Sequence, residues 1–201
     1  MSYSVKEIYY TIQGEGHRAG TPNVFLRFAG CNLWSGKEED RASAICKFCD
    51  TDFLNGETLN LGQLMNKVRV AWRGDTEHKA VVLTGGEPML QVDRKLIDAL
   101  QTSGFYVAIE TNGTIDVPIP IDWITVSPKE GSKIKQFMGD ELKFVFPQGD
   151  LPGREYHFDH YYVQPMDGPD LVENTRLCVE FVKSNPSWKL SLQTHKMIGI
   201  R

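Results

Sequence analysis

The sequence predicts an α/β fold in which a mostly parallel sheet forms a partial and irregular (β/α) barrel. Short runs of β-branched or aromatic residues alternate with segments whose apolar residues recur at helical spacing. Strands that alternate with helices favour parallel pairing through right-handed crossovers. Between residues 118 and 152 no convincing helical pattern occurs, so we expect short loops between the later strands and an incomplete barrel.

Each predicted element follows from its own local pattern. Strands are expected at NVFLRFAG, KAVVLTGG, FYVAIETNG, IDWITVSPK, ELKFVFPQ, HYYVQP and WKLSLQTH, which cover residues 23–30, 79–86, 105–113, 121–129, 141–148, 160–165 and 188–195. Helices are expected at residues 61–72, 92–102 and 171–183, where apolar residues fall on one face.

The predicted strands share a feature at their carboxyl ends, where the sequence turns polar or glycine-rich. These ends are AGC, LTGGEP, IETNG, VSPK, VQPMDG and LQTH. In parallel α/β sheets the strand ends and their loops converge at one edge, and ligands bind there. Six such ends predict one shared pocket.

Length and composition limit the possible classes of protein. A chain of 201 residues is long enough for one sizeable core, and a single domain spanning residues 1–201 is expected. Its formal charge of −4 provides no basic surface for nucleic acid or an anionic membrane. No signal peptide pattern and no run of the roughly 18 apolar residues of a membrane span occurs. We therefore expect a cytoplasmic protein with reduced thiols.

Three of the four cysteines are clustered, as Cys31, Cys46 and Cys49, with C-x14-C-x2-C spacing. This spacing leaves open an iron–sulfur cluster, a zinc site, or redox or structural thiols. A structural zinc site needs four ligands, and neither His17 nor His78 has the spacing of a zinc module. A centre with three thiolates and one open iron accounts for the count best. The fourth cysteine lies on an apolar helical face and is expected in the core.

A second group, TGGEP, follows a predicted strand at residues 84–88. Two glycines allow the backbone to approach a ligand closely, and Glu87 adds an acceptor for an ammonium group. A lone pair of glycines is more often a tight turn. The position after a strand, beside the cysteine loop, favours a ligand site.

Together these residues resemble the radical S-adenosylmethionine superfamily, although its usual cysteine spacing is C-x3-C-x2-C. The motifs YTIQGEG, RFAGCNLWSG, CDTDF, TGGEPMLQ, IETNG, VSPK, VQPMDGP and QTHK resemble the 7-carboxy-7-deazaguanine synthase family, in its branch with an expanded cluster loop. They occur in order from Val5 to Lys196. The resemblance implies a cluster loop at residues 30–53 and a substrate-side strand and tail at residues 188–201.

The resemblance also implies a reaction and its cofactors. The reaction is the radical-mediated ring contraction of 6-carboxy-5,6,7,8-tetrahydropterin to 7-carboxy-7-deazaguanine with loss of ammonia, in the biosynthesis of queuosine and other 7-deazapurines. Cys31, Cys46 and Cys49 would hold a [4Fe-4S] cluster whose open iron binds S-adenosylmethionine. A flavodoxin- or ferredoxin-type electron donor and a homodimer are implied as partners.

By the same resemblance, one set of residues would hold S-adenosylmethionine. Gly85, Gly86 and Glu87 would contact its amino group. The backbone around Phe48 would contact the adenine, and Cys49 and Asp50 are expected among the other cofactor contacts. The remaining contacts to ribose, carboxylate and adenine are expected from Ser127, Pro128, Lys129, Gln164, Pro165, Met166 and Asp167. Glu110 and Asn112 lie on an adjacent strand end, either touching the cofactor or capping a turn.

A second set would hold the pterin and Mg²⁺. Ile12, Gln13 and Gly14 are expected at the amino-pyrimidinone edge, with Glu15 accepting from the 2-amino group. Arg27 would pair with the substrate carboxylate, a structural ion pair being the alternative. Thr84, His195 and the terminal carboxylate of Arg201 would complete the pocket. Thr51, with Asp50 less favoured, would bind Mg²⁺, although DTD is also typical of a capping turn.

Two other functions remain open from the sequence. A glycyl-radical activase would use the same cofactor on a protein substrate, but the chain has no extra cysteine cluster and no docking extension. The second alternative is a zinc-binding module, which would have no enzymatic activity. The segment between Cys31 and Cys46, residues 32–45, is charged, and a short solvated helix is expected over residues 37–44. It either closes the loop or also docks the electron donor.

Overall fold

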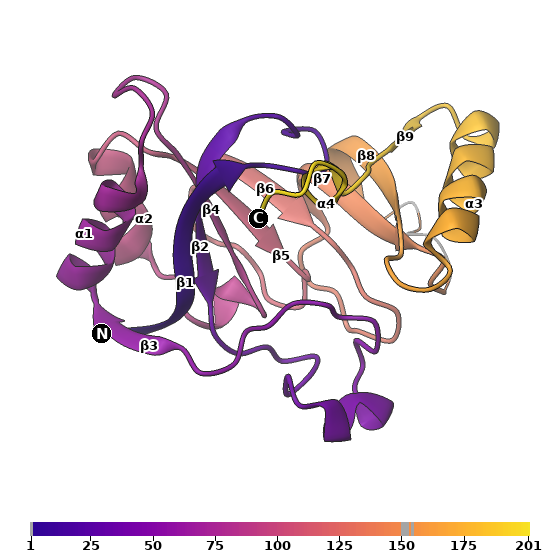
Figure 1. Cartoon of the computed structure of the whole chain (residues 1–201), viewed down its shortest axis with the longest axis horizontal. Coiled ribbons are helices and arrows are strands. Elements are labelled where there is room, and N and C mark those ends of the chain that lie inside the picture. The colour runs from indigo at the N-terminus through magenta and orange to yellow at the C-terminus, as the bar shows by residue number, and fades with distance from the viewer. Residues whose placement is uncertain (1, 150–152, 154) are drawn as a thin grey trace.

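The computed structural model describes residues 2–149, 153 and 155–201, and its centre is a nine-stranded sheet of order β3-β1-β2-β4-β5-β6-β7-β8-β9 (Figure 1). The strands are β1 (Ser2–Ile12), β2 (Pro22–Phe28), β3 (Glu57–Asn60), β4 (Ala80–Gly85), β5 (Tyr106–Thr111), β6 (Trp123–Val126), β7 (Met138–Phe146), β8 (His157–Pro165) and β9 (Trp188–Leu190). From β2 to β9 all pairs are parallel, whereas β1 is antiparallel to both β2 and β3. Because β3 and β9 lie at opposite ends of this order, the sheet is open, as a partial barrel requires.

Within the described ranges, four α-helices and two short 3₁₀ helices accompany the sheet. They are α1 (Leu61–Ala71), α2 (Arg94–Thr102), α3 (Leu171–Ser184), α4 (Thr194–Met197), η1 (Glu38–Ser43) and η2 (Pro88–Leu90). Asn60 caps α1 through a capping box with Gln63, and the Asp93 side chain accepts from the Leu96 N–H at the start of α2. Such caps satisfy N–H groups that have no partner within the helix.

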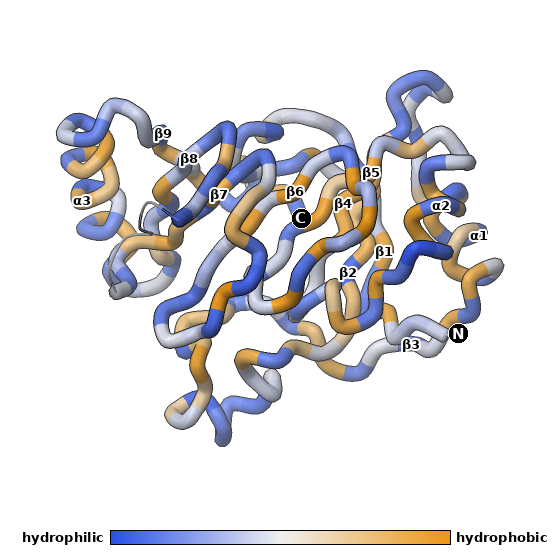
Figure 2. Tube along the Cα trace, turned by 180° about the vertical axis from the view of Figure 1, so that it is seen from behind, coloured by the Kyte–Doolittle hydropathy of each residue, from blue (hydrophilic) through white to orange (hydrophobic). Residues whose placement is uncertain are grey.

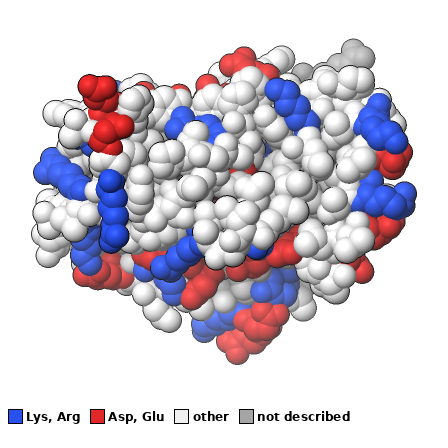
Figure 3. All heavy atoms as spheres, turned by 45° about the horizontal axis from the view of Figure 1, so that its top comes forward, with Lys and Arg blue, Asp and Glu red and all other residues white. Residues whose placement is uncertain are grey.

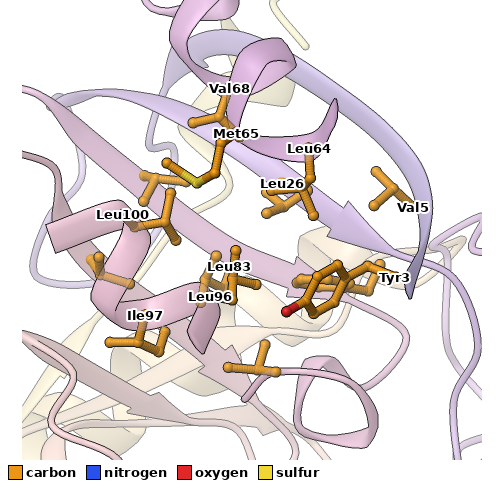
Figure 4. Close-up of a cluster of buried hydrophobic side chains, with 14 of the residues drawn as sticks. Tyr3, Val5, Leu26, Leu64, Met65, Val68, Leu83, Leu96, Ile97 and Leu100 are labelled. Atoms are coloured by element: carbon orange, nitrogen blue, oxygen red, sulfur yellow. The ribbon is translucent and has the colours of Figure 1, made fainter. Parts of the chain in front are cut away.

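The main core lies between one face of the sheet and helices α1 and α2. Figure 4 shows Leu64 and Val68 of α1, and Leu96 and Leu100 of α2, directed at side chains of the strands. These four leucine and valine side chains are completely buried. Burial of such a side chain contributes about 1.5–3 kcal/mol, so this layer fixes the strands that carry the site.

The opposite face of the sheet is concave and largely polar toward the strand ends. Alternate residues of each strand point to opposite faces, and those on this side include Arg27, Thr84, Glu110, Thr125 and Lys143, all of which line a cavity. Hydrophobic residues concentrate along the central strands, and hydrophilic ones dominate the outer loops (Figure 2). The tail crosses in front of this face, where Figure 1 places the C-terminus.

Several features differ from the sequence prediction. The predicted last strand, residues 188–195, ends at Leu190, and residues 194–197 form α4. The strand stops because Thr194 donates both its N–H and its hydroxyl to the carbonyl of Gly14, which turns the chain across the cavity. Strands β1 and β3 were not predicted, although β1 buries Tyr3 and Val5 in alternation.

Other predictions are confirmed. The connection between β6 and β7, residues 127–137, contains no helix. The expected short helix between Cys31 and Cys46 is present as η1 and has no buried residues. Within the described residues, no helix has the length and apolar character to cross a membrane. Basic and acidic side chains are interspersed over the face shown in Figure 3.

Candidate active site

The carboxyl ends of the parallel strands meet around one cavity of about 530 Å³. Each of the six polar strand ends contributes to its wall, as do the cluster loop, the segment after β1 and the tail. The predicted site residues on this wall are Ile12, Gln13, Gly14, Glu15, Arg27, Cys31, Cys46, Phe48, Cys49, Asp50, Thr51, Thr84, Gly85, Gly86, Ser127, Lys129, Gln164, Pro165, Asp167, His195 and Arg201. The shared pocket expected from the strand ends is therefore present.

Three predicted cofactor residues do not line this cavity, namely Glu87, Pro128 and Met166. The carboxylate of Glu87 is completely buried. It accepts hydrogen bonds from the N–H of Met89, the hydroxyl of Thr111 and the N–H of Asn112, at 2.8–2.9 Å. Burial raises its pKa, and these donors oppose that effect. Glu87 thus ties the end of β4 to the end of β5, while the backbone of the two preceding glycines faces the cavity.

The three cysteines of the loop are free thiols on the wall of the same cavity. The Leu33 N–H donates to Cys31 Sγ at 3.4 Å. The Cys46 thiol donates to Cys49, which lowers the pKa of Cys49 to about 6 and raises that of Cys46. The described residues contain no group of three or more His, Cys, Asp and Glu side chains arranged to hold a single metal ion.

The glycine loop packs directly against the first cysteine. A Cβ atom on Gly86 would lie 2.1 Å from the carbonyl oxygen of Gly30 and 2.7 Å from Cys31 Cβ. The Glu87 N–H also donates to the Gly30 carbonyl at 2.9 Å. Only glycine allows the backbone to come this close to the first cysteine. Three thiols next to such a backbone fit an iron–sulfur cluster that has an open coordination site with a small ligand beside it.

A half-buried lysine, Lys129, lies on the cavity wall near the Cys46 and Cys49 thiols. Lys129 Nζ donates to the carbonyl and hydroxyl oxygens of Ser127, at 2.6 and 2.7 Å. Burial lowers its pKa, and the nearby Cys46 and Cys49 thiols partly offset that effect. No carboxylate within 4.0 Å pairs with Lys129 among the described residues. Its charge is available for an anionic ligand.

A second lysine of the cavity wall, Lys143, is buried and organises the segment after β1. Lys143 Nζ lies 2.5 Å from Glu15 and 3.8 Å from Glu110. Gln13 Nε2 donates to Glu110 at 2.7 Å, and Gln193 Nε2 donates to Glu15 at 2.9 Å. Burial opposes ionisation of Glu15, but Lys143 outweighs it and lowers the pKa of Glu15 to about 2. Burial also disfavours charged Lys143, whose pKa the carboxylates raise above its usual range.

An arginine pair shares one carboxylate beside β1. Arg27 Nε donates to Glu7 Oε1 at 2.8 Å and its NH2 group to the Tyr9 hydroxyl at 3.2 Å. Glu7 Oε2 accepts from the guanidinium of Arg201, which lies over the Tyr9 ring. Thr11 donates its hydroxyl to the Arg201 carbonyl at 2.7 Å. Two guanidinium groups therefore share the Glu7 carboxylate here.

The residues around the predicted Mg²⁺ site differ in availability. Lys196 Nζ bridges Asp50 and Asp167, at 2.6 and 2.5 Å, and so joins α4 to the cluster loop and to the end of β8. Asp52 pairs with Lys6 at 2.6 Å. Thr51 lies on the cavity wall between these two paired aspartates.

Comparison with known proteins shows which family the chain belongs to. No protein-family model matches it. A 7-carboxy-7-deazaguanine synthase from Burkholderia multivorans is 51% identical over 209 residues, covering all of both chains. Those from Caulobacter vibrioides and Bacteroides thetaiotaomicron are 51% and 42% identical, again over the full length of both chains. The chain belongs to the 7-carboxy-7-deazaguanine synthase family.

A solved structure supports the same fold. The crystal structure of QueE from Escherichia coli superposes with a TM-score of 0.70 at 26% identity, covering 96% of this chain and 94% of that one. The predicted radical S-adenosylmethionine fold and lyase class are thereby confirmed. For a 7-carboxy-7-deazaguanine synthase, an iron–sulfur cluster, S-adenosylmethionine and a small-molecule substrate are implied.

Sequence reasoning missed several wall residues, among them Glu7, Lys143, Gln193 and Lys196. Lys143 falls inside a predicted strand, and a lysine flanked by leucine and phenylalanine is a signal that could have marked it. Glu110 and Asn112 both line the cavity. Asn112 also accepts from the Thr114 N–H at 3.0 Å, so it caps a turn as well.

Proposed function

We propose that the chain converts 6-carboxy-5,6,7,8-tetrahydropterin to 7-carboxy-7-deazaguanine with loss of ammonia, in queuosine and 7-deazapurine biosynthesis. The observation that carries the proposal is the single cavity, which brings three free cysteines together with all six polar strand ends. Family membership supports the same conclusion. Cys31, Cys46 and Cys49 would hold a [4Fe-4S] cluster, leaving one iron for S-adenosylmethionine.

The chain would hold the cofactor by backbone and charge. When bound, the cluster and S-adenosylmethionine supply a 5′-deoxyadenosyl radical, chemistry that belongs to the cofactor. The backbone of Gly85 and Gly86 would receive the amino group, and Lys129 would receive the carboxylate because its charge has no carboxylate partner nearby. Gln164 and Asp167 remain the candidates for the ribose and adenine.

The substrate would lie between the two charged clusters at the other end of the cavity. Glu15, held ionised by Lys143, would accept from the 2-amino group while residues 12–14 align the pyrimidinone edge. Arg27 would pair with the substrate carboxylate, and the terminal carboxylate of Arg201 would complete the pocket. Thr84 and His195 would border the ring between them.

Mg²⁺ would be held by Thr51 together with oxygens of the substrate. Both neighbouring aspartates are engaged by lysines, Asp50 by Lys196 and Asp52 by Lys6. That pairing supports Thr51 over Asp50 as the protein ligand. Carboxylate and carbonyl oxygens of the substrate are suitable partners for this hard cation.

Further parts of the proposal concern the protein as a whole. We propose a single domain over residues 1–201, a cytoplasmic location and a homodimer. A flavodoxin or ferredoxin would deliver the electron that the cluster needs. No direct contact with nucleic acid or membrane is proposed, because the net charge of −4 favours neither.

Anaerobic reconstitution tests the proposal. The protein is loaded with iron and sulfide, then incubated with S-adenosylmethionine, a strong reductant, Mg²⁺ and 6-carboxy-5,6,7,8-tetrahydropterin. We expect 7-carboxy-7-deazaguanine by mass spectrometry and ammonia in equal amount. Cofactor cleavage without this product would refute the substrate and point toward a protein substrate, as for an activase. A colourless protein with stoichiometric zinc and no iron would refute the enzyme.

A further inference from the structure

The segment between Cys31 and Cys46 sets one arginine against the second half of the cluster loop. In Figure 1 this segment forms the lobe below the sheet, with η1 at its lower end. Arg41 lies in η1, and its NH1 group donates to the carbonyl of Lys47 at 2.9 Å and to that of Cys49 at 3.1 Å. One nitrogen therefore bridges two carbonyls of the C-x-x-C turn.

Besides these two carbonyls, an aromatic ring and a carboxylate hold the guanidinium of Arg41. It lies over the ring of Trp34, with its central carbon 4.1 Å from the ring centroid. Its Nε donates to Glu38 at 2.7 Å. Trp34 is only 8% exposed, donates to the Lys37 carbonyl and packs edge-on against Phe53. Because the planar guanidinium is already held on the Trp34 ring, it loses little further conformational freedom when it binds the two carbonyls.

We propose that Arg41 is a positioning residue for the iron–sulfur cluster, which fixes the Cys46–Cys49 turn and places a permanent positive charge beside its thiolates. This inference rests on the proposed function, because it assumes that the cysteines hold a cluster. In a short cysteine spacing the chain itself keeps the three ligands close together. The long gap after Cys31 removes this restraint from the second and third ligands. The inserted segment supplies that restraint through space instead.

Charge gives the same contact a second effect. Reduction adds one electron to the cluster and its thiolates, and a nearby fixed cation stabilises the more negative state. Arginine keeps its charge at every working pH. Arg41 is thus expected to raise the reduction potential of the cluster and to make electron transfer from a weak donor easier.

The competing explanation is an ordinary surface ion pair with Glu38, which would stabilise η1 and have no effect on the cluster. The chain offers a matched control for it. Arg176 on α3 forms the same kind of pair with Glu173, at 2.7 Å and three residues apart, far along the chain from the three cysteines of the cluster loop. Glu38→Gln removes the pair of Arg41 while leaving its carbonyl contacts and charge.

Four variants of the full chain test the proposal: Arg41→Gln, Arg41→Lys, Glu38→Gln and Arg176→Gln. Each is reconstituted anaerobically beside the wild type. Three quantities are measured: thermal unfolding of the metal-free protein, the rate of iron loss to a chelator, and the cluster potential from a redox titration followed by electron paramagnetic resonance. A wild-type protein that takes up no cluster would refute the proposed function itself.

For Arg41→Gln we expect roughly tenfold faster iron loss, as loss of two hydrogen bonds to the turn implies, and a more negative potential. The thermal midpoint of the metal-free protein should fall by only a few degrees, which would show that the fold is intact. Arg41→Lys restores the charge, so its potential should return toward the wild-type value while iron loss stays faster. Glu38→Gln and Arg176→Gln should match the wild type. Iron loss and potential of Arg41→Gln equal to those of Arg176→Gln would overturn the proposal, as would equal potentials for Arg41→Lys and Arg41→Gln.

Discussion

Removing the Lys143 ammonium should destabilise the protein by an amount that depends on pH. The side chain of Lys143 is 6% exposed and that of Glu15 is 16% exposed, so solvent screens their pairing little. Lys143→Met keeps most of the volume of the side chain but leaves Glu15 and Glu110 without their cation. Breaking a buried pair in this way is strongly destabilising, because it strands a buried charge.

The size of the effect follows from the Glu15 carboxyl. Its pKa of about 2 lies below the ordinary value of 4.5, and at about 1.4 kcal/mol per pKa unit this difference amounts to about 3 kcal/mol. Because the folded-state pKa is the lower one, the stabilisation is complete above pH 4.5 and is lost as the pH falls toward 2. For a chain of this length, the thermal midpoint should drop by about 6–12 °C at pH 7.

Urea unfolding of the metal-free protein, followed by circular dichroism at pH 7 and near pH 3, measures this effect. The destabilisation by Lys143→Met should be largest at pH 7 and clearly smaller in acid. Lys183→Met is the control: its pair with Glu180 has side chains 66% and 55% exposed and should contribute less than about 1 kcal/mol. Adding Glu15→Gln to Lys143→Met should cost less than the two single changes summed. A loss below about 1 kcal/mol, or one independent of pH, would refute the reasoning.

Three further changes probe the cofactor side. Thr51→Ala should weaken the Mg²⁺ dependence of product formation while the cluster absorbance stays intact; loss of the cluster would instead show a structural role. Gly86→Ala should lower iron content several-fold, because its Cβ would meet the Gly30 carbonyl at 2.1 Å, whereas Gly62→Ala, with its nearest neighbour at 3.4 Å, should not. Lys196→Met frees the tail from Asp50 and Asp167 and should raise KM for S-adenosylmethionine roughly fivefold; an unchanged KM would contradict a bridging role.

The sequence predicted that the strand ends meet at one cavity better than it predicted the bounds of the individual strands. Cysteine spacing and polar strand ends are local signals, and both led to the observed cavity because parallel strands bring their ends together. The end of β9 was mispredicted because WKLSLQTH has strand propensity throughout. What stops that strand is the bond from Thr194 to Gly14, a contact between positions 180 residues apart in the chain. Tertiary contacts of this kind override local propensity.

For the same reason, the partners of charged side chains cannot be predicted from local sequence patterns. Glu87 was expected at the cavity as an acceptor for ammonium, since glutamate after two glycines has no local partner. The structure supplies partners from β5, the Thr111 hydroxyl and the Asn112 N–H. Arg41 likewise looked like one more charge on a solvated helix. Its contacts to the Lys47 and Cys49 carbonyls depend on how the segment folds back on the loop.

The charges of the cavity determine which way a substrate can enter. At one end Lys143 lies between the carboxylates of Glu15 and Glu110, so this end is acidic and suits hydrogen-bond donors such as an amino group. At the other, the guanidinium groups of Arg27 and Arg201 both contact Glu7, and Arg27 is the group that would bind a carboxylate. A carboxylated pterin turned end for end would set its carboxylate against the acidic cluster, and like charges in a poorly screened cavity disfavour that orientation by several kcal/mol. Under the proposed function, the same two clusters that bind the substrate therefore also fix its orientation toward the cysteine loop.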